Sequence, residues 1–273
     1  MRAYACGRGW GRRRPSLSAR SEGVCPKRKG RDPVKKEIFT AGGRDCTAYA
    51  CSRPQYLLIQ PVDDSDLSVL DAEAETIARG AGEKFILAAF AIKAWDQELS
   101  PWTAPPVFGK IPFGNGAETT LRLIEESLLP DITERFSLSQ NIPVILGGYS
   151  LAGFFALWSG YQTDRFSAVM AASPSVWFPG WMEYARTHPV RCDYAYLSLG
   201  RKEGKTKNKT MAAVEENIRI QHELLCAEHA AGPSKPKACI LEWNEGNHFA
   251  DPDKRCTKGF IWCMRQSVTE RQE

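Results

Sequence analysis

A serine flanked by small residues is the first side chain in this 273-residue sequence that could do covalent chemistry. Ser150 lies in PVILGGYSLAGFFALW, where an apolar run leads into the serine and a helical pattern follows it. A strand-to-helix corner of this kind strains the serine backbone and requires small residues two positions before and after it, here Gly148 and Ala152. We therefore predict a nucleophile elbow, with alanine where a second glycine is more usual. A capping serine in an ordinary turn is the alternative.

A serine hydroxyl becomes a good nucleophile only beside a base, and the sequence offers four histidines. His248 follows the apolar run ACILEW through the loop NEGN, so we expect it at the carboxyl edge of a sheet, where ligands bind. His188 precedes a proline in a loop, and His222 and His229 lie seven residues apart on a predicted amphipathic helix. His248 is therefore the predicted base, with a loop histidine that caps the next helix as the alternative.

The acid that would orient this histidine is expected in the loop after the run YAYLSLG. Glu203 lies three residues beyond Gly200 and could hold the imidazole tautomer and stabilise the imidazolium. The alternative is that Glu203 is one more solvated charge in the run RKEGKTKNK. Asp193 and Asp251 lie at less suitable positions, before the strand and beyond the histidine.

Negative charge that develops on a substrate oxygen would need two backbone N–H donors. The N–H of Leu151, directly after the serine, is the predicted first donor. The second is expected in the turn after the run FILAAF, near Ile92 or Lys93, with Ile92 as the working choice.

Aromatic residues in nearby loops could cover a shallow substrate pocket, because their rings provide a large apolar area at low entropic cost. The predicted pocket residues are Trp95, Asp96, Trp102 and Trp177, with Phe178 and Trp181 beside the last. Ordinary core or surface packing is the alternative for the tryptophans, and loop capping is the alternative for Asp96.

The elements that must position these residues alternate between short β-branched runs and longer segments of helical period. Strands are predicted at 36–41, 46–51, 56–61, 85–90, 143–149, 166–173, 194–200 and 238–243. Helices are predicted at 67–79, 118–135, from 151 onward, 210–229 and 253–266. The pattern predicts one α/β domain with a mostly parallel central sheet and helices on both faces. Only about twenty residues separate the sixth and seventh strands, so no large cap domain is expected there.

Basic residues are concentrated at the start of the sequence. Residues 1–36 carry a net charge of +10, whereas the whole chain carries +4. Glycine, proline and serine separate these charges without apolar periodicity, so we predict a basic disordered extension, or a start codon assigned too far upstream, and no nucleic-acid partner. The α/β domain is predicted over 37–267, followed by a polar tail at 268–273.

The remaining composition excludes several classes of protein. No apolar run reaches the roughly 18 residues of a membrane helix, and a secretory signal is not recognisable, so we predict no membrane partner. The nine cysteines form no CxxC pair, and several lie in apolar runs, which is typical of free buried thiols. Together with the missing signal, this predicts a location in the reducing cytoplasm. We predict no metal site and, since phosphate-cradling and dinucleotide motifs are missing, no cofactor. The sequence predicts no particular oligomeric state.

From residue 37 to about 265 the chain resembles bacterial esterases related to the esterase D and enterochelin-esterase-like branch of the α/β-hydrolase superfamily. The segments that carry the resemblance are IFTAGGRDCTAYAC, YLLIQPVDD, WDQELSPWTAPPVFGK, GGYSLAGFFALW, AASPSVWFPGW and EWNEGNHF. The resemblance implies an α/β-hydrolase fold with Ser150 as nucleophile and His248 as base. Such proteins tend to carry an acidic residue directly after SLG, where this chain has Arg201. If that position supplies the acid, activity is impaired, whereas a role for Glu203 leaves it intact.

The predicted function is hydrolysis of a small-molecule carboxylic ester by a Ser-His-acid triad through an acyl-enzyme intermediate. Two alternatives belong to other classes. An acyltransferase would use the same elbow but exclude water and pass the acyl group to an alcohol. A catalytically impaired, hydrolase-like binding protein is the second alternative, motivated by Arg201.

Overall fold

The computed structural model describes residues 34–82, 84–107, 109–230 and 235–269. Most of the predicted basic extension and the last four residues of the predicted tail therefore lie outside the described residues. The first strand begins at Lys35, two residues before the predicted start of the α/β domain. The last helix ends at Thr269, three residues beyond its predicted end at 266 and two beyond the predicted end of the domain at 267.

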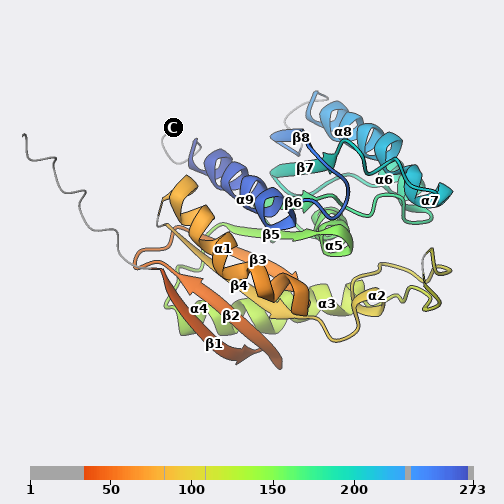
Figure 1. Ribbon diagram of the computed structural model, residues 1–273. Coiled ribbons are helices and arrows are strands. Elements are labelled where there is room, and N and C mark those ends of the chain that lie inside the picture. Colours follow the sequence, from red (N-terminus) through yellow and green to blue (C-terminus); the bar gives the residue numbers. More distant parts are fainter. Residues whose placement is uncertain (1–33, 83, 108, 231–234, 270–273) are drawn as a thin grey trace, which may run out of the picture. The chain divides into compact units, whose positions relative to one another are not determined.

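A mixed sheet of eight strands forms the centre of the described part of the chain (Figure 1). Its order is β1-β2-β4-β3-β5-β6-β7-β8. The strands are β1 (Lys35–Ala41), β2 (Arg44–Ala50), β3 (Tyr56–Val62), β4 (Phe85–Ala91), β5 (Val144–Tyr149), β6 (Ala168–Ala172), β7 (Tyr194–Gly200) and β8 (Ala238–Asn244). β1 and β2 form an antiparallel hairpin, β2 is antiparallel to β4, and all pairs from β4 to β8 are parallel. Each strand overlaps one predicted from the sequence.

Burial on both faces explains why the central strands read as continuous apolar runs. Every residue of β3, β5, β6 and β7 is buried. The hairpin of β1 and β2 turns at Gly42 and Gly43, whose positive φ angles of 55° and 68° suit glycine.

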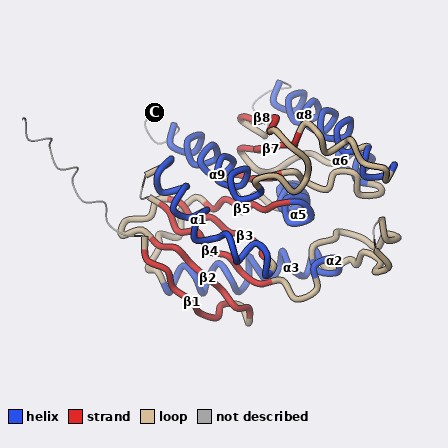
Figure 2. Tube along the Cα trace, in the orientation of Figure 1, coloured by secondary structure: helices blue, strands red, loops and turns tan. Residues whose placement is uncertain are grey.

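Helices cover both faces of the sheet, as Figure 2 shows in blue against the red strands. They include α1 (Asp64–Ala81), α3 (Ala117–Leu123), α4 (Leu129–Arg135), α5 (Ser150–Gln162), α8 (Val214–Ala230) and α9 (Pro252–Thr269). α1 and α9 pack together on one face, where Cys256, Phe260 and Cys263 recur at helical spacing and join the core beneath them. α5 packs with the remaining helices in a second core on the opposite face.

The helices differ from the sequence prediction in four places. The predicted helix 118–135 is interrupted by a π-helical turn, η1 (Ile124–Leu128), and the predicted helix 210–229 is divided into α7 (Lys209–Ala212) and α8. α2 (Trp95–Glu98) and α6 (Trp181–Thr187) are additional and too short to produce a recognisable period. α6 is the only helix between β6 and β7 in this fully described segment, so the connection forms no large cap. None of the helices in the described ranges has the length and hydropathy needed to cross a bilayer.

Candidate active site

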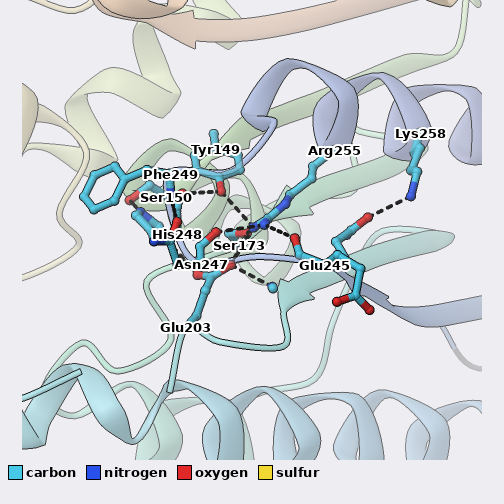
Figure 3. A network of polar contacts seen from close by, with 12 residues as sticks. Tyr149, Ser150, Ser173, Glu203, Glu245, Asn247, His248, Phe249, Arg255 and Lys258 are labelled. Carbon is cyan, nitrogen blue, oxygen red and sulfur yellow. Dashed lines mark hydrogen bonds and ion pairs between the residues drawn. The ribbon is translucent and has the colours of Figure 1, made fainter. Parts of the chain in front are cut away.

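The three side chains predicted to do chemistry follow three parallel strands at the same edge of the sheet. Ser150 comes directly after β5, Glu203 lies three residues after β7, and His248 lies four residues after β8. Because the carboxyl ends of parallel strands meet at one edge, residues 98 positions apart in the sequence come into contact there. Figure 3 shows the resulting network of polar contacts.

Ser150 occupies a strained corner between β5 and α5. Its φ is +57°, a conformation that non-glycine residues rarely adopt. A Cβ on Gly148 would lie 2.6 Å from the Cβ of Ala152, and one on Gly153 would lie 2.8 Å from the carbonyl oxygen of Gly148. The chain can therefore make this corner only with small residues on both sides of the serine. This is the geometry predicted for a nucleophile elbow.

His248 lies between the serine and the glutamate. Its Nε2 is 3.0 Å from Ser150 Oγ, and its Nδ1 is 2.7 Å from Glu203 Oε2. An ionised carboxylate can only accept hydrogen bonds, so the proton of a neutral imidazole belongs on Nδ1. Nε2 is then left as an acceptor for the serine hydroxyl. This arrangement allows His248 to take the proton from Ser150.

Glu203 is buried, and its two carboxylate oxygens have different partners. Oε2 faces His248, whereas Oε1 accepts hydrogen bonds from Ser173 Oγ at 2.8 Å and from the Gly200 N–H at 2.7 Å. Burial raises the pKa of Glu203. The hydrogen bond and electrostatic attraction of His248, together with the hydrogen bonds from the Gly200 N–H and Ser173, outweigh burial and hold the pKa below its usual value. Glu203 is therefore an anion at neutral pH.

A buried arginine completes this network, and nothing in the sequence pattern singled it out. Arg255, in the first turn of α9, is 1% exposed, and its Nη1 donates to Glu203 Oε1 at 2.6 Å. The same nitrogen lies 2.8 Å from Ser173 Oγ and 3.0 Å from the hydroxyl of Tyr149, while Nη2 donates to two carbonyl oxygens of the β8–α9 loop. Arg255 thus joins the glutamate to the loop that carries His248.

The hydroxyl of Tyr149 gives that loop a second link. It donates to the carbonyl oxygen of His248 at 2.6 Å, and its ring lies beside the imidazole with centroids 5.3 Å apart. Tyr149 directly precedes the serine in the chain. Both the backbone and the ring of the histidine are therefore fixed relative to Ser150.

Arg201, the residue that departs from the resemblance, lies outside this network. Its side chain is 59% exposed and forms an ion pair with the exposed Glu245. Glu203 reaches the histidine from two positions further along the same turn, with its own N–H bonded to the carbonyl of Gly200. The arginine therefore leaves the carboxylate–imidazole contact intact.

The two predicted oxyanion donors differ in their surroundings. Leu151 is the second residue of α5, so its N–H belongs to the helix start, where backbone donors have no partner within the helix. The N–H of Ile92 donates instead to the carbonyl of Val62 at 3.0 Å. Ile92 is therefore engaged at the end of the sheet, which argues against its predicted role. The neighbouring N–H of Lys93 lies 3.2 Å from a carboxylate oxygen of Glu98.

A cavity of about 470 Å³ opens beside His248 and Glu203. Trp177, Met211, Val214 and Phe249 supply apolar walls, and three lysines of the β7–α7 loop, Lys202, Lys205 and Lys207, line it as well. The cavity can thus accept an apolar group while positive charge lies nearby. Trp177 was predicted to line the pocket; the lysines, Met211, Val214 and Phe249 were not.

Trp95, Asp96 and Trp102 do not line this cavity, and neither do Phe178 and Trp181, which are buried in the core. Trp102 donates from Nε1 to the carbonyl of Pro179 at 2.8 Å and packs against Phe178. Trp95 packs on the core, and the carbonyl of Asp96 accepts the hydroxyl of Ser100 at 2.8 Å. Trp95 and Trp102 therefore pack within and beside the loop after β4, which is the alternative interpretation of the tryptophans.

No family model and no curated protein sequence matches this chain. Solved structures do match it. The IroE-like serine hydrolase from Shewanella oneidensis aligns with a TM-score of 0.68 and 15% identity over 84% of this chain and 79% of its own. The siderophore hydrolase EstB from Aspergillus nidulans aligns with a TM-score of 0.66 and 16% identity over 87% of this chain and 97% of its own. The enterobactin esterase FES from Shigella flexneri aligns with a TM-score of 0.59 and 16% identity over 86% of this chain and 60% of its own.

The chain has the α/β-hydrolase fold. The predicted fold class is therefore confirmed, and the structural neighbours include serine hydrolases and siderophore or enterobactin esterases, as the resemblance implied. At identities near 15% this likeness concerns the fold and not the reaction. The function must be argued from the contacts around Ser150.

Proposed function

We propose that this protein is a serine hydrolase that cleaves small-molecule carboxylic esters, with Ser150 as nucleophile, His248 as general base and Glu203 as the acid. The observation that carries the proposal is the unbroken series of contacts from Ser150 Oγ through His248 to Glu203, at 3.0 and 2.7 Å, beside a cavity. The ionised state of Glu203 and the hydrogen-bond partners of the three side chains support these roles.

In the first half of the reaction, Ser150 Oγ attacks the ester carbonyl while His248 Nε2 takes the hydroxyl proton. The Leu151 N–H would stabilise the negative charge on the carbonyl oxygen. When the tetrahedral intermediate collapses, the bond to the alcohol oxygen breaks, and His248 returns its proton to the leaving alcohol. An acyl group remains on Ser150.

In the second half, His248 removes a proton from a water molecule, whose oxygen attacks the acyl carbonyl. Collapse of this second intermediate breaks the bond to Ser150, which regains its proton from His248, and releases the carboxylic acid. Glu203 remains ionised throughout and stabilises the imidazolium that forms in each half. Its low pKa, caused by its hydrogen-bond donors, supports this role.

Two measurements test the proposal together. A fluorophosphonate probe is expected to label the parent protein at Ser150 and to leave Ser150→Ala unlabelled. Ser150→Ala and His248→Ala should each reduce hydrolysis of p-nitrophenyl acetate about 10⁴-fold or more, since the members of a triad act as a unit.

Matched controls are available for both residues. Ser159 is a buried serine on the same helix, and His229 is a helix histidine bonded to a backbone carbonyl. Ser159→Ala and His229→Ala should retain labelling and hydrolysis within about threefold. Turnover that survives in Ser150→Ala, or an equal loss in His229→Ala, would refute the assignment. Product analysis with an added alcohol separates hydrolysis from acyl transfer.

A further inference from the structure

Two cysteines and a histidine meet on the far part of α8, away from Ser150. His222 and Cys226 lie four residues apart on the same helix face, and Cys239 is the second residue of the neighbouring strand β8. Cys226 Sγ is 3.5 Å from His222 Nε2 and 3.2 Å from Cys239 Sγ. The three donor atoms all lie within 4.8 Å of one another, and both cysteines are free.

The chemistry of these donors matches a soft cation. Thiolate and imidazole are the ligands that Zn²⁺ takes in proteins, at about 2.3 Å for sulfur and about 2.0 Å for nitrogen. A tetrahedral ion would hold two such sulfurs roughly 3.8 Å apart. The two thiols at 3.2 Å need to separate by only about half an ångström, which small side-chain rotations can provide. The site is partly open, so water can supply a fourth ligand.

We propose that His222, Cys226 and Cys239 form a binding site for a thiophilic divalent cation, of which Zn²⁺ is the representative. The ion would join α8 to β8, which is the last strand of the sheet and pairs only with β7 among the described strands. Cys226 lies twelve residues beyond Val214, the cavity residue at the start of α8, or about 18 Å along the helix axis. The site is therefore separate from the cavity and from the ester chemistry proposed above.

The geometry also explains why the sequence did not reveal the site. A histidine and a cysteine at i and i+4 lie on one helix face and can bind the same metal ion. The third donor, Cys239, lies on a strand and is separated from Cys226 by a dozen residues of sequence. The CxxC spacing by which zinc sites are usually recognised is missing. Only the packing of α8 on β8 brings Cys239 into the group.

Co²⁺ titration of the reduced protein tests the proposal. Cys6 and Cys25 lie outside the described residues and are replaced by serine in every sample, so that their thiols cannot compete. A phosphine reductant keeps the remaining thiols reduced. We expect one equivalent of Co²⁺ to produce the near-ultraviolet thiolate-to-cobalt absorption band, and one equivalent of Zn²⁺ to remove it.

The variants locate the ion. Cys226→Ser/Cys239→Ser should lose the band, and His222→Ala should weaken binding about 100-fold or more, since even outer partners of a ligand contribute 10- to 100-fold. His229→Ala, on the same helix but outside the cluster, should bind as the parent does. Zn²⁺ at about 100 times its Kd should raise the Tm of the parent by roughly 5 to 10 °C and leave the double-serine variant unchanged.

Three results would overturn the proposal. An unchanged cobalt band in the double-serine variant would mean that other thiols bind the ion. No band in the folded, reduced parent would mean that the cluster binds no such cation. A Cys226–Cys239 disulfide that survives the phosphine, seen as a loss of two hydrogens by mass spectrometry, would show that the two thiols prefer each other to a metal. Each readout is independent of ester hydrolysis, so none depends on Ser150 being a nucleophile.

Discussion

Replacing Glu203 with glutamine changes one oxygen to an NH₂ group, and the surrounding donors decide which way the amide must face. Oε1 accepts from Ser173, from the Gly200 N–H and from Arg255. An NH₂ group on that side would face three donors, so the glutamine carbonyl must take the place of Oε1. The NH₂ group then faces His248 Nδ1, which must accept its hydrogen bond.

The imidazole is thereby forced into the tautomer with its proton on Nε2. That nitrogen lies 3.0 Å from Ser150 Oγ and can then no longer take the serine proton. The same change of tautomer in a serine protease lowers kcat by about 10⁴, so we expect a loss of that order in kcat for Glu203→Gln.

Stability should fall as well, because Arg255 loses its counter-charge. The side chains of Arg255 and Glu203 are 2% and 3% exposed, and breaking a buried pair of this kind costs about 3 to 5 kcal/mol. The glutamine carbonyl still accepts the hydrogen bonds that Oε1 accepted, so we expect a cost near the lower end of this range, about 3 kcal/mol. At about 2 to 4 °C per kcal/mol for a domain of this size, the expected decrease in Tm is roughly 6 to 12 °C.

The assay is hydrolysis of p-nitrophenyl acetate well below the Tm of the variant, with folding checked by circular dichroism. The matched control is Arg201→Asp. Arg201 pairs only across an exposed surface with Glu245, and such pairs contribute little, so its activity should stay within about threefold of the parent. Substantial activity in Glu203→Gln, or a tenfold gain in Arg201→Asp, would refute the reasoning and indicate that position 201 is the proper place for the acid.

Burial raises the pKa of Glu73 from 4.5 to about 8. Between pH 4.5 and about 8 the folded chain therefore keeps a proton that the unfolded chain releases. The free energy of unfolding, measured by urea titration, should fall by roughly a few kcal/mol as the pH rises through this range. Glu73→Gln should abolish this decline. An ester with a terminal carboxylate should be hydrolysed more slowly as salt is added, and Lys205→Gln should reduce its kcat/KM about two- to fivefold; equal salt effects on a neutral ester would contradict this. Gly148→Ala, whose Cβ would lie 2.6 Å from that of Ala152, should lower turnover about 100-fold without unfolding the protein, and full activity would rule out the tight corner.

The sequence predicted the parts of the fold that depend on short-range pattern. Strands buried on both faces read as apolar runs, and α9 shows a clear helical period, so both could be recognised. Chain order then indicated which strand ends carry Ser150, Glu203 and His248. The π-helical turn inside the predicted helix 118–135 could not be recognised, because its residues keep a helix-like composition.

The parts that the sequence did not predict depend on contacts between distant segments. Arg255 has the composition of a surface residue on an amphipathic helix, yet it is buried because Glu203, 52 positions earlier, offsets its charge. Ile92 follows the run FILAAF as an oxyanion donor should, but its N–H is bonded to the carbonyl of Val62, thirty residues earlier. The loop after β4 packs Trp102 against Pro179, and no local pattern specifies that path.

The β7–α7 loop has a consequence for how this protein can diversify. Glu203 lies between Lys202 and Lys205 in a single turn, and all three line the same cavity. Substitutions of the lysines can alter which molecules enter, while an insertion or deletion between Gly200 and Glu203 would shift the carboxylate away from His248. Lineages and laboratory libraries are therefore expected to vary the side chains of this loop while they keep its length up to Glu203 constant. Successful loop exchange between relatives should require donors that preserve the spacing from Gly200 to Glu203.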